Sequence, residues 1–259
     1  MKNLSLNNSS ASESRIIDEC AEMLKRKGAV LLLPTETVYG FMCRWDDSEA
    51  RARIFKMKKR SSDKPFQMLA SSICQAEKEG LIFDGEAKTI AEKFFPGPLT
   101  LVVKNRNGGT TGLRIPNHPF ILKLIGKIGS PLAATSANIS GEPAALTVED
   151  ALKNLESLPD IAIDSGRIEA GTASTVVDAS TTPFKILRPG PIKEEEIRQA
   201  VKAGLLVEQS LSAWRRVRAT QAISDIQQES VRKGTDHLSL SDIDAEIVKV
   251  RQGRRKPAK

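Results

Sequence analysis

The chain has 259 residues, a net charge of +7 and a pI near 9.3, which is compatible with an anionic ligand such as a nucleotide or RNA. Its 40% of hydrophobic and 4% of aromatic residues are typical of a soluble protein with an aliphatic core. No apolar run approaches the roughly 20 residues that span a bilayer, and the N-terminus lacks the apolar segment of a secretory signal. We therefore expect a cytoplasmic protein without a membrane partner.

Helical and strand patterns interleave irregularly between residues 14 and 203. In chain order they predict helix 14–27, strand 29–33, helix 50–57, strand 66–70, helix 86–94, strands 99–103 and 113–115, helix 120–128, strand 131–134, helix 148–155, strands 161–164, 174–178 and 184–187, and helix 194–203. This irregular order favours an α/β fold with a twisted open mixed sheet over a strictly alternating barrel.

The two ends of the chain differ from this body in composition. Residues 1–11 are rich in serine and asparagine and predict a disordered leader. Residues 207–259 carry a net charge of +4, which leaves +3 for the rest of the chain. Segments 211–216 and 239–250 have the pattern of amphipathic helices, but the piece is too short for a substantial core. We expect one main domain over residues 12–206, followed by a basic helical extension.

The cysteines and histidines argue against two common kinds of stabilising site. Cys20, Cys43 and Cys74 are odd in number and have no close spacing, so a disulfide framework is not expected. Only His118 and His237 could join them as zinc ligands, and we assign no metal-binding residue. His118 is expected to be a loop histidine rather than a catalytic base.

Two polar turns could together hold a polyphosphate. Residues 58–67 are rich in lysine, arginine and serine, and residues 136–141 form a remote turn of small hydroxyl and amide side chains. Cationic donors bind phosphate, and short side chains let it approach the backbone. The chain has no Gly-x-x-x-x-Gly-Lys-Ser/Thr loop, so this would be a nucleotide site of another design. Taken alone, the basic turn is better explained as a solvated helix end.

Three further positions carry polar groups next to apolar strands. Residues 34–40, Pro-Thr-Glu-Thr-Val-Tyr-Gly, follow a buried strand, where ligands gather in open α/β sheets. In isolation this segment is better explained as an ordinary hydroxyl-rich turn. Arg114 lies between apolar strand residues and needs an anionic partner, which could equally be a structural carboxylate or a ligand. The same two alternatives apply to Arg188.

Seven short motifs stand in a specific order within residues 14–205. They are 34–40, 58–60, 95–100, 114–116, 136–141, 174–178 and 187–190. In this combination they resemble the YrdC-like threonylcarbamoyl-AMP synthase family, and the Lys-x-Arg with its distant Ser-x-Asn is the most specific element. Ser61 and Thr135 stand where the family commonly has proline, which affects the expected loop geometry but not the reaction class.

The resemblance implies a fold and a reaction. The family has an α/β twisted open sheet with a deep, positively charged concave surface. It converts L-threonine, bicarbonate or CO2, and ATP with Mg²⁺ into L-threonylcarbamoyladenylate and pyrophosphate, as a nucleotidyltransferase. The product serves N6-threonylcarbamoyladenosine formation at tRNA position 37, in a second step performed by a separate transferase complex. The expected partners are these substrates, tRNA and that complex.

The family's functional residues carry over by motif position. Lys58 and Arg60 would be the catalytic cations. L-Threonine would contact Thr35, Gln67, Arg114, Ala134 and Ser174, with Arg114 on the substrate carboxylate. ATP would contact Lys58, Arg60, Ser62, Thr110, Ser136, Asn138, Ala144 and Arg188. The two alanines could act only through their backbone groups.

The chemistry agrees with these residue types. A threonine carbamate is already nucleophilic and would attack the α-phosphorus, while fixed cations offset the growing phosphate charge. No covalent protein nucleophile is needed, and the chain shows no convincing Ser/His/Asp or Cys/His set.

Two other functions use the same domain. A non-catalytic module could hold double-stranded RNA or tRNA in the basic concavity, although the body's charge of +3 argues against a large RNA footprint. A carbamoyl-transfer maturation factor would be the third, and the absence of paired Cys-x-x-Cys fingers argues against it.

Overall fold

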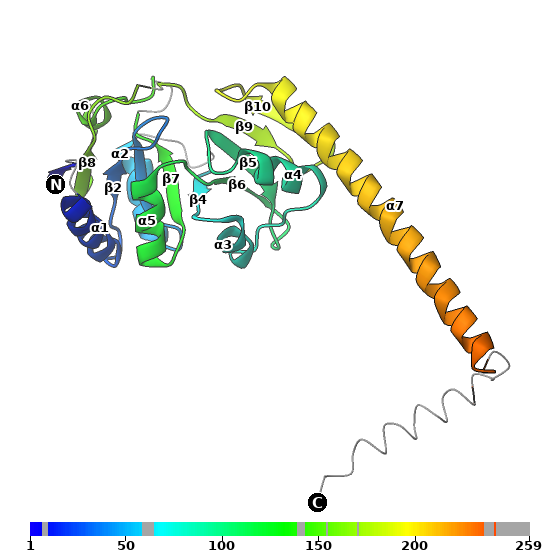
Figure 1. Cartoon of the computed structure of the whole chain (residues 1–259). Coiled ribbons are helices and arrows are strands. Elements are labelled where there is room, and N and C mark those ends of the chain that lie inside the picture. The colour runs from blue at the N-terminus through cyan, green and yellow to red at the C-terminus, as the bar shows by residue number, and fades with distance from the viewer. Residues whose placement is uncertain are drawn as a thin grey trace, which may run out of the picture. The chain divides into compact units, whose positions relative to one another are not determined.

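The computed structural model describes residues 1–6, 10–58, 65–138, 143–153, 155–169, 171–235 and 241. The chain forms two compact units, Met1–Lys202 and Ala203–Lys259. In the first unit, the described residues form one ten-stranded mixed sheet with helices packed on it (Figure 1). Within this part of the chain every helix is too short or too polar to cross a membrane.

The sheet combines parallel and antiparallel pairs. Its strands are β1 (Lys2–Ser5), β2 (Leu31–Leu33), β3 (Gly40–Arg44), β4 (Gln67–Leu69), β5 (Leu99–Lys104), β6 (Thr110–Arg114), β7 (Leu132–Ser136), β8 (Ile161–Asp164), β9 (Thr175–Asp178) and β10 (Lys185–Arg188). Their order across the sheet is β1-β8-β2-β3-β7-β4-β6-β5-β9-β10. The pairs β1/β8, β2/β8, β4/β6 and β5/β9 are parallel and the others are antiparallel. The predicted open mixed α/β sheet is confirmed.

The helices begin and end where local side chains satisfy the backbone. They are α1 (Ser10–Leu24), α2 (Ser48–Met57), α3 (Ile73–Lys78), α4 (Gly85–Phe94), α5 (Pro119–Ile128), α6 (Val148–Leu152) and α7 (Glu194–Arg232). Asp47, Ser72 and Thr147 each accept a hydrogen bond from a backbone N–H in the first turn of α2, α3 and α6, respectively. Gly129, with φ of 67°, ends α5 in the left-handed conformation that glycine adopts without strain.

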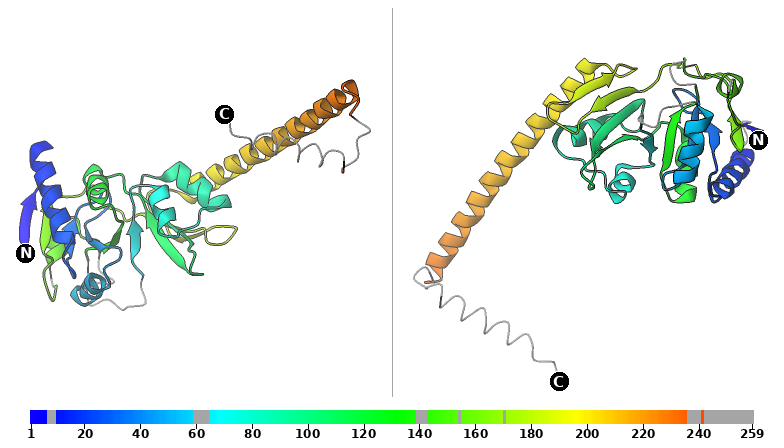
Figure 2. Two further views of the ribbon diagram at one scale, coloured as in Figure 1. Left: turned by 90° about the horizontal axis from the view of Figure 1, so that it is seen from below. Right: turned by 180° about the vertical axis from the view of Figure 1, so that it is seen from behind.

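Alternation along the strands builds the core. Leu31 and Leu33 point into a cluster with α1 and α5, whereas Leu32 points into a second cluster with α2 and α6. Helices α1 and α5 therefore cover one side of this part of the sheet, and α2 covers the other side, as the front and back views show (Figures 1 and 2). Each fully buried leucine contributes about 1.5–3 kcal/mol to folding.

The same alternation creates a polar face on the other half of the sheet. Leu99 and Leu101 of β5 are buried in a third cluster with α3, α4 and the first turns of α7. Thr100, between them, must point to the opposite face. In β6 and its neighbour β4, Arg114 and Gln67 likewise alternate with buried apolar residues. Polar side chains from three adjacent strands are thereby gathered on one face.

The structure differs from the sequence expectations in a few elements. Every helix and strand predicted between residues 14 and 203 overlaps an observed one, but β3 and α3 were not predicted. The N-terminus, expected to be a disordered leader, contains β1, which pairs in parallel with β8 through Lys2 and Ile161. Its Leu4 packs against the cluster of α1 and α5, a contact that the polar composition hides.

Helix α7 is much longer than predicted. It continues past Ala203 to Arg232, so the boundary expected at residue 206 and the short helix expected at 211–216 both lie inside it. The expected helix at 239–250 falls outside the described residues apart from Ser241. A single glycine, Gly204, costs a helix only about 1 kcal/mol and does not end this one.

The central position of Leu32 gives a test of the core. Its side chain is fully buried, so Leu32→Ala should lower the free energy of unfolding by about 2–5 kcal/mol in urea denaturation. The control is Leu158→Ala, at a side chain that is 47% exposed, and we expect a change within about 0.5 kcal/mol. Equal losses in the two variants would contradict the assignment of Leu32 to the core.

Candidate active site

A cavity of about 380 Å³ opens on the polar face of the sheet. Its walls come from segments far apart in the sequence, and they consist of Val38, Lys58, Pro65, Gln67, Arg114, Ala134, Thr135, Ser136, Asn138, Ala173, Ser174, Val176 and Arg188. Eight of the residues predicted for the site are among them: Lys58, Gln67, Arg114, Ala134, Ser136, Asn138, Ser174 and Arg188. Three of the eight are cations, and no described aspartate or glutamate lines the cavity, so this space is suited to anions.

Lys58 connects the two remote turns, 58–67 and 136–141, that were predicted to hold a polyphosphate. It caps the C-terminus of α2, and its side chain is only 2% exposed. Its Nζ donates to Thr135 Oγ1 at 3.1 Å and to the carbonyl oxygen of Ser136, both at the end of β7. The alternative of a solvated helix end is therefore wrong for Lys58. These two contacts hold the ammonium group of Lys58 in the cavity wall, beside the end of β7.

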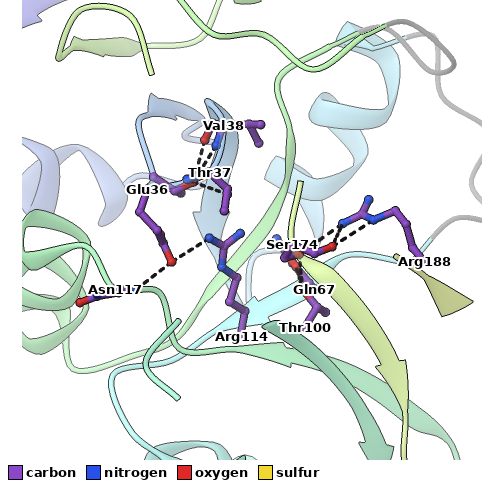
Figure 3. Close-up of polar contacts among 10 residues, drawn as sticks. Glu36, Thr37, Val38, Gln67, Thr100, Arg114, Asn117, Ser174 and Arg188 are labelled. Atoms are coloured by element: carbon purple, nitrogen blue, oxygen red, sulfur yellow. Dashed lines mark hydrogen bonds and ion pairs between the residues drawn. The ribbon is translucent and has the colours of Figure 1, made fainter. Parts of the chain in front are cut away.

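Arg114 lies at the end of β6 and is 3% exposed. Its Nη2 forms an ion pair of 2.9 Å with Glu36 Oε1, and the same oxygen accepts the backbone N–H of Asn117 at 2.9 Å (Figure 3). A structural carboxylate and a ligand were the alternative partners expected for Arg114. The structure shows the first, while Arg114 still lines the cavity where the second would bind.

A directional chain of hydrogen bonds crosses the cavity wall from β10 to β4 (Figure 3). Arg188 Nη2 donates to the carbonyl oxygen of Ser174 at 2.8 Å and to its Oγ at 3.2 Å. Ser174 Oγ lies 2.8 Å from Thr100 Oγ1, which donates to Gln67 Oε1 at 2.9 Å. Because the only proton of Thr100 goes to Gln67, Ser174 must be the donor to Thr100. The chain fixes all four side chains.

The two arginines influence each other across this wall. Burial lowers the pKa of Arg188 below its ordinary value, and the nearby positive charge of Arg114 lowers it further. Two guanidinium groups close enough to repel each other are stabilised when an anion binds between or beside them.

Gly190 allows Arg188 to reach Ser174. A Cβ atom at this position would lie 2.4 Å from the backbone nitrogen of Thr175 and 2.8 Å from the carbonyl oxygen of Ala173. Only a residue without a side chain lets the segment after β10 pass so close to the start of β9. This close approach explains why the Arg-Pro-Gly motif ends in glycine.

Thr35 acts within its own turn. Its Oγ1 donates to the carbonyl oxygen of Val38 at 2.7 Å and accepts the N–H groups of Thr37 and Val38, each at 3.2 Å. Val38 lines the cavity and Thr35 does not. The expected contact of Thr35 with a substrate remains a prediction, whereas its shaping of the 34–40 turn is observed.

Among the other predicted residues, Thr110 and Ala144 do not line this cavity. Thr110 lines a second cavity of about 650 Å³ that shares Pro65, Gln67 and Val176 with the first. Ala144 is half-buried and lines neither cavity. Arg60 and Ser62 fall outside the described residues.

Several residues of the site were missed from the sequence. Glu36 and Thr100 lie within predicted motifs but were given no role, and the aromatic side chains of Trp45, Phe55 and Phe66, which line the second cavity, were not assigned to the site. For Thr100 a usable signal was present, because it is a lone hydroxyl within an apolar strand. No local signal identified Glu36 as the partner of Arg114.

His118 agrees with its expected role as a loop residue. It precedes α5, and it lines neither cavity. Burial lowers the pKa of His118 below its ordinary value, against the opposing effect of the neighbouring Glu36 and Glu13 carboxylates. Within the described part of the chain, no group of three or more Cys, His, Asp or Glu residues is arranged to hold a metal ion.

Comparison with known proteins agrees with this geometry. The model of the Sua5/YciO/YrdC family, described as "Telomere recombination", matches residues 23–190. A threonylcarbamoyl-AMP synthase of Pyrococcus abyssi is 37% identical over 185 residues, which are 68% of this chain and 54% of the relative. A putative threonylcarbamoyl-AMP synthase of Mycobacterium tuberculosis is 35% identical over 68% of this chain and 85% of its own length.

Comparison with solved structures also finds a Sua5 protein. The crystal structure of P. abyssi Sua5 complexed with L-threonine is 32% identical, has a TM-score of 0.67, and is matched over 77% of this chain and 60% of that one. The ten-stranded open mixed sheet is the YrdC-like fold that the motifs predicted. The chain belongs to the Sua5/YciO/YrdC family. It spans 54% and 58% of the first two curated relatives that it matches.

The close backbone approach at Gly190 gives a test of the site's construction. Gly190→Ala should destabilise the protein by about 1–3 kcal/mol and disturb Arg188, because the new methyl group meets fixed backbone atoms. Gly126→Ala in α5 is the matched control, since a Cβ there meets nothing within 4 Å and alanine favours helix. Thermal unfolding of both variants checks this, and a Gly190→Ala variant as stable as wild type would contradict the steric argument.

Proposed function

We propose that this protein is a threonylcarbamoyl-AMP synthase that makes L-threonylcarbamoyladenylate and pyrophosphate from L-threonine, bicarbonate and ATP. The observation that carries the proposal is the contact of buried Lys58 with the Thr135-Ser136 turn, because it brings both halves of the nucleotide signature to one cavity. The names of the relatives, at 34–37% identity, support the same activity.

L-Threonine binds with its carboxylate on Arg114. The buried guanidinium faces the cavity and offers a planar pair of donors, which matches a carboxylate better than a lysine would. Gln67 and Ser174, fixed by Thr100, contact the rest of the amino acid, and Ala134 contributes its backbone. Thr35 takes part through the turn that presents Val38. The L-threonine complex of P. abyssi Sua5 supports an amino-acid site in this family.

ATP extends from the first cavity into the second. Lys58, Ser136, Asn138 and Arg188 surround the phosphates in the first cavity. The shared walls connect it to the larger cavity, whose aromatic rings and Thr110 suit the nucleoside end. Arg60 and Ser62 complete the phosphate contacts by motif position, and Ala144 does so through its backbone.

The cations then act during the reaction. The threonine carbamate attacks the α-phosphorus, pyrophosphate leaves, and Lys58, Arg60 and Arg188 offset the charge that develops on the phosphate oxygens. Mg²⁺ bound to the ATP phosphates would offset part of their charge beside these cations.

The product serves the modification of tRNA position 37 in the cytoplasm. An acyl adenylate is labile, and its consumption requires tRNA and a threonylcarbamoyl-transferase complex as downstream partners. The runner-up function, a non-catalytic double-stranded RNA or tRNA module, has the basic cavity in its favour, but a narrow space lined by Gln67, Ser174 and Arg114 fits a small zwitterion better.

Substitution of Lys58 tests the proposed reaction. Lys58→Ala should lower the rate of pyrophosphate release from ATP, in the presence of threonine and bicarbonate, by about 10²–10³-fold, because a fixed cation at the phosphates is lost. Lys88→Ala, at an exposed lysine of α4, is the control and should have wild-type activity. Wild-type rates for Lys58→Ala would remove the nucleotide site from this cavity.

Substitution of Arg114 separates the two substrates. Arg114→Lys keeps the charge but loses the planar donor pair, so the KM for threonine should rise about tenfold while the KM for ATP stays within about twofold. Initial rates measured at varied threonine and varied ATP decide this. An unchanged threonine KM would refute the carboxylate role of Arg114.

A further inference from the structure

The guanidinium of Arg114 is incompletely satisfied although it is almost fully buried. Among the described residues its ion-pair partner is Glu36, and its Nε has no hydrogen-bond partner there. A buried charged donor without a hydrogen-bond partner lowers the free energy of unfolding. Because Arg114 lines the cavity and Glu36 does not, the guanidinium lies between the carboxylate and the space where a ligand would bind.

Glu36 is itself anchored. Its Oε1 bridges Arg114 Nη2 and the backbone N–H of Asn117, each at 2.9 Å, so it ties the end of β6 to the segment that leads into α5 (Figure 3). Its Oε2 is also buried and has no hydrogen-bond partner within the described residues. The backbone of Asn117 therefore holds this carboxylate in place, and Glu36 and Arg188 lie on opposite sides of Arg114 (Figure 3).

The negative charge of Glu36 offsets a repulsion within the cavity wall. Arg114 and Arg188 face the same space of about 380 Å³, and the charge of Arg114 is close enough to act on Arg188. Without a counter-charge, a buried guanidinium beside a second one moves toward water or another carboxylate. Glu36 is the described carboxylate that pairs with Arg114 and removes this tendency.

We propose that Glu36 is a positioning residue for amino-acid binding: it fixes Arg114 so that the guanidinium accepts a second carboxylate, that of the substrate, on its cavity side. Glu36 does not leave when the substrate binds, and Arg114 is then held between two carboxylates. This inference rests on the proposed function, since it presumes that the ligand on Arg114 is the amino acid. It predicts an effect on threonine binding and none on ATP binding.

The test is a double-mutant cycle in the full-length protein, read by pyrophosphate release. Glu36→Gln keeps the shape and an oxygen that can accept from Asn117, but it removes the charge. We expect the KM for threonine to rise at least about tenfold, with the KM for ATP and kcat within about threefold. In the Arg114→Lys background the effect of Glu36→Gln on threonine KM should largely disappear, because Glu36 acts through Arg114.

Controls separate the possible failures. Glu13→Gln, which removes the surface partner of Lys123, should leave all constants unchanged. If Glu36→Gln does not fold, Glu36→Asp keeps the charge on a shorter side chain and should raise the threonine KM by a smaller factor. If wild-type release does not require threonine, the proposed function fails. If it does, an unchanged or lowered threonine KM in Glu36→Gln, or additive effects in the cycle, would overturn the role of Glu36 alone.

Discussion

The site depends on one buried contact, between the ammonium group of Lys58 and the Thr135-Ser136 end of β7. A lysine with almost no exposed surface is stable only where other polar atoms replace its water, and the two turn residues each supply an oxygen atom. This contact brings the end of α2 to the middle of the sheet. The cavity, with Asn138 beside it, forms where the two segments meet.

The sheet supplies the rest of the cavity wall, because successive side chains of each strand point to opposite faces. In β5, Thr100 alternates with buried leucines, and Gln67 of β4 and Arg114 of β6 alternate with buried apolar residues in the same way. These three side chains therefore lie on one face of the sheet, where they meet Ser174. Because these side chains stand on hydrogen-bonded strands, their spacing is set by the backbone. The long-range contacts of Glu36 and Arg188 then fix the direction of the two guanidinium groups.

The sequence predicted the fold class and most of the elements, because apolar periodicity is a local property that the burial of Leu32 and its neighbours follows directly. It missed β1, whose stability comes from pairing with β8. It also missed the length of α7, which continues past the single Gly204 because no proline or second glycine follows to end the helix there. Neither feature has a local signal.

Site residues were predicted where a motif named them, and eight of these line one cavity. The interaction partners of these residues were harder to predict from the sequence. Whether Arg114 had a carboxylate of the protein or a ligand was left open, since pairing with Glu36 depends on a contact across 78 positions of sequence. The hydroxyl of Thr35 also shapes its own turn, a role that the motif did not reveal. Such choices depend on tertiary geometry rather than on composition.

We propose that fixed cations from remote segments hold a triphosphate beside an amino acid in a single cavity. A crystal structure of the protein with L-threonine and a non-hydrolysable ATP analogue tests it most directly. We expect the threonine carboxylate on Arg114 and the phosphates on Lys58, Ser136 and Arg188 in the same crystal. A nucleotide bound away from Lys58, or threonine bound away from Arg114, would contradict it.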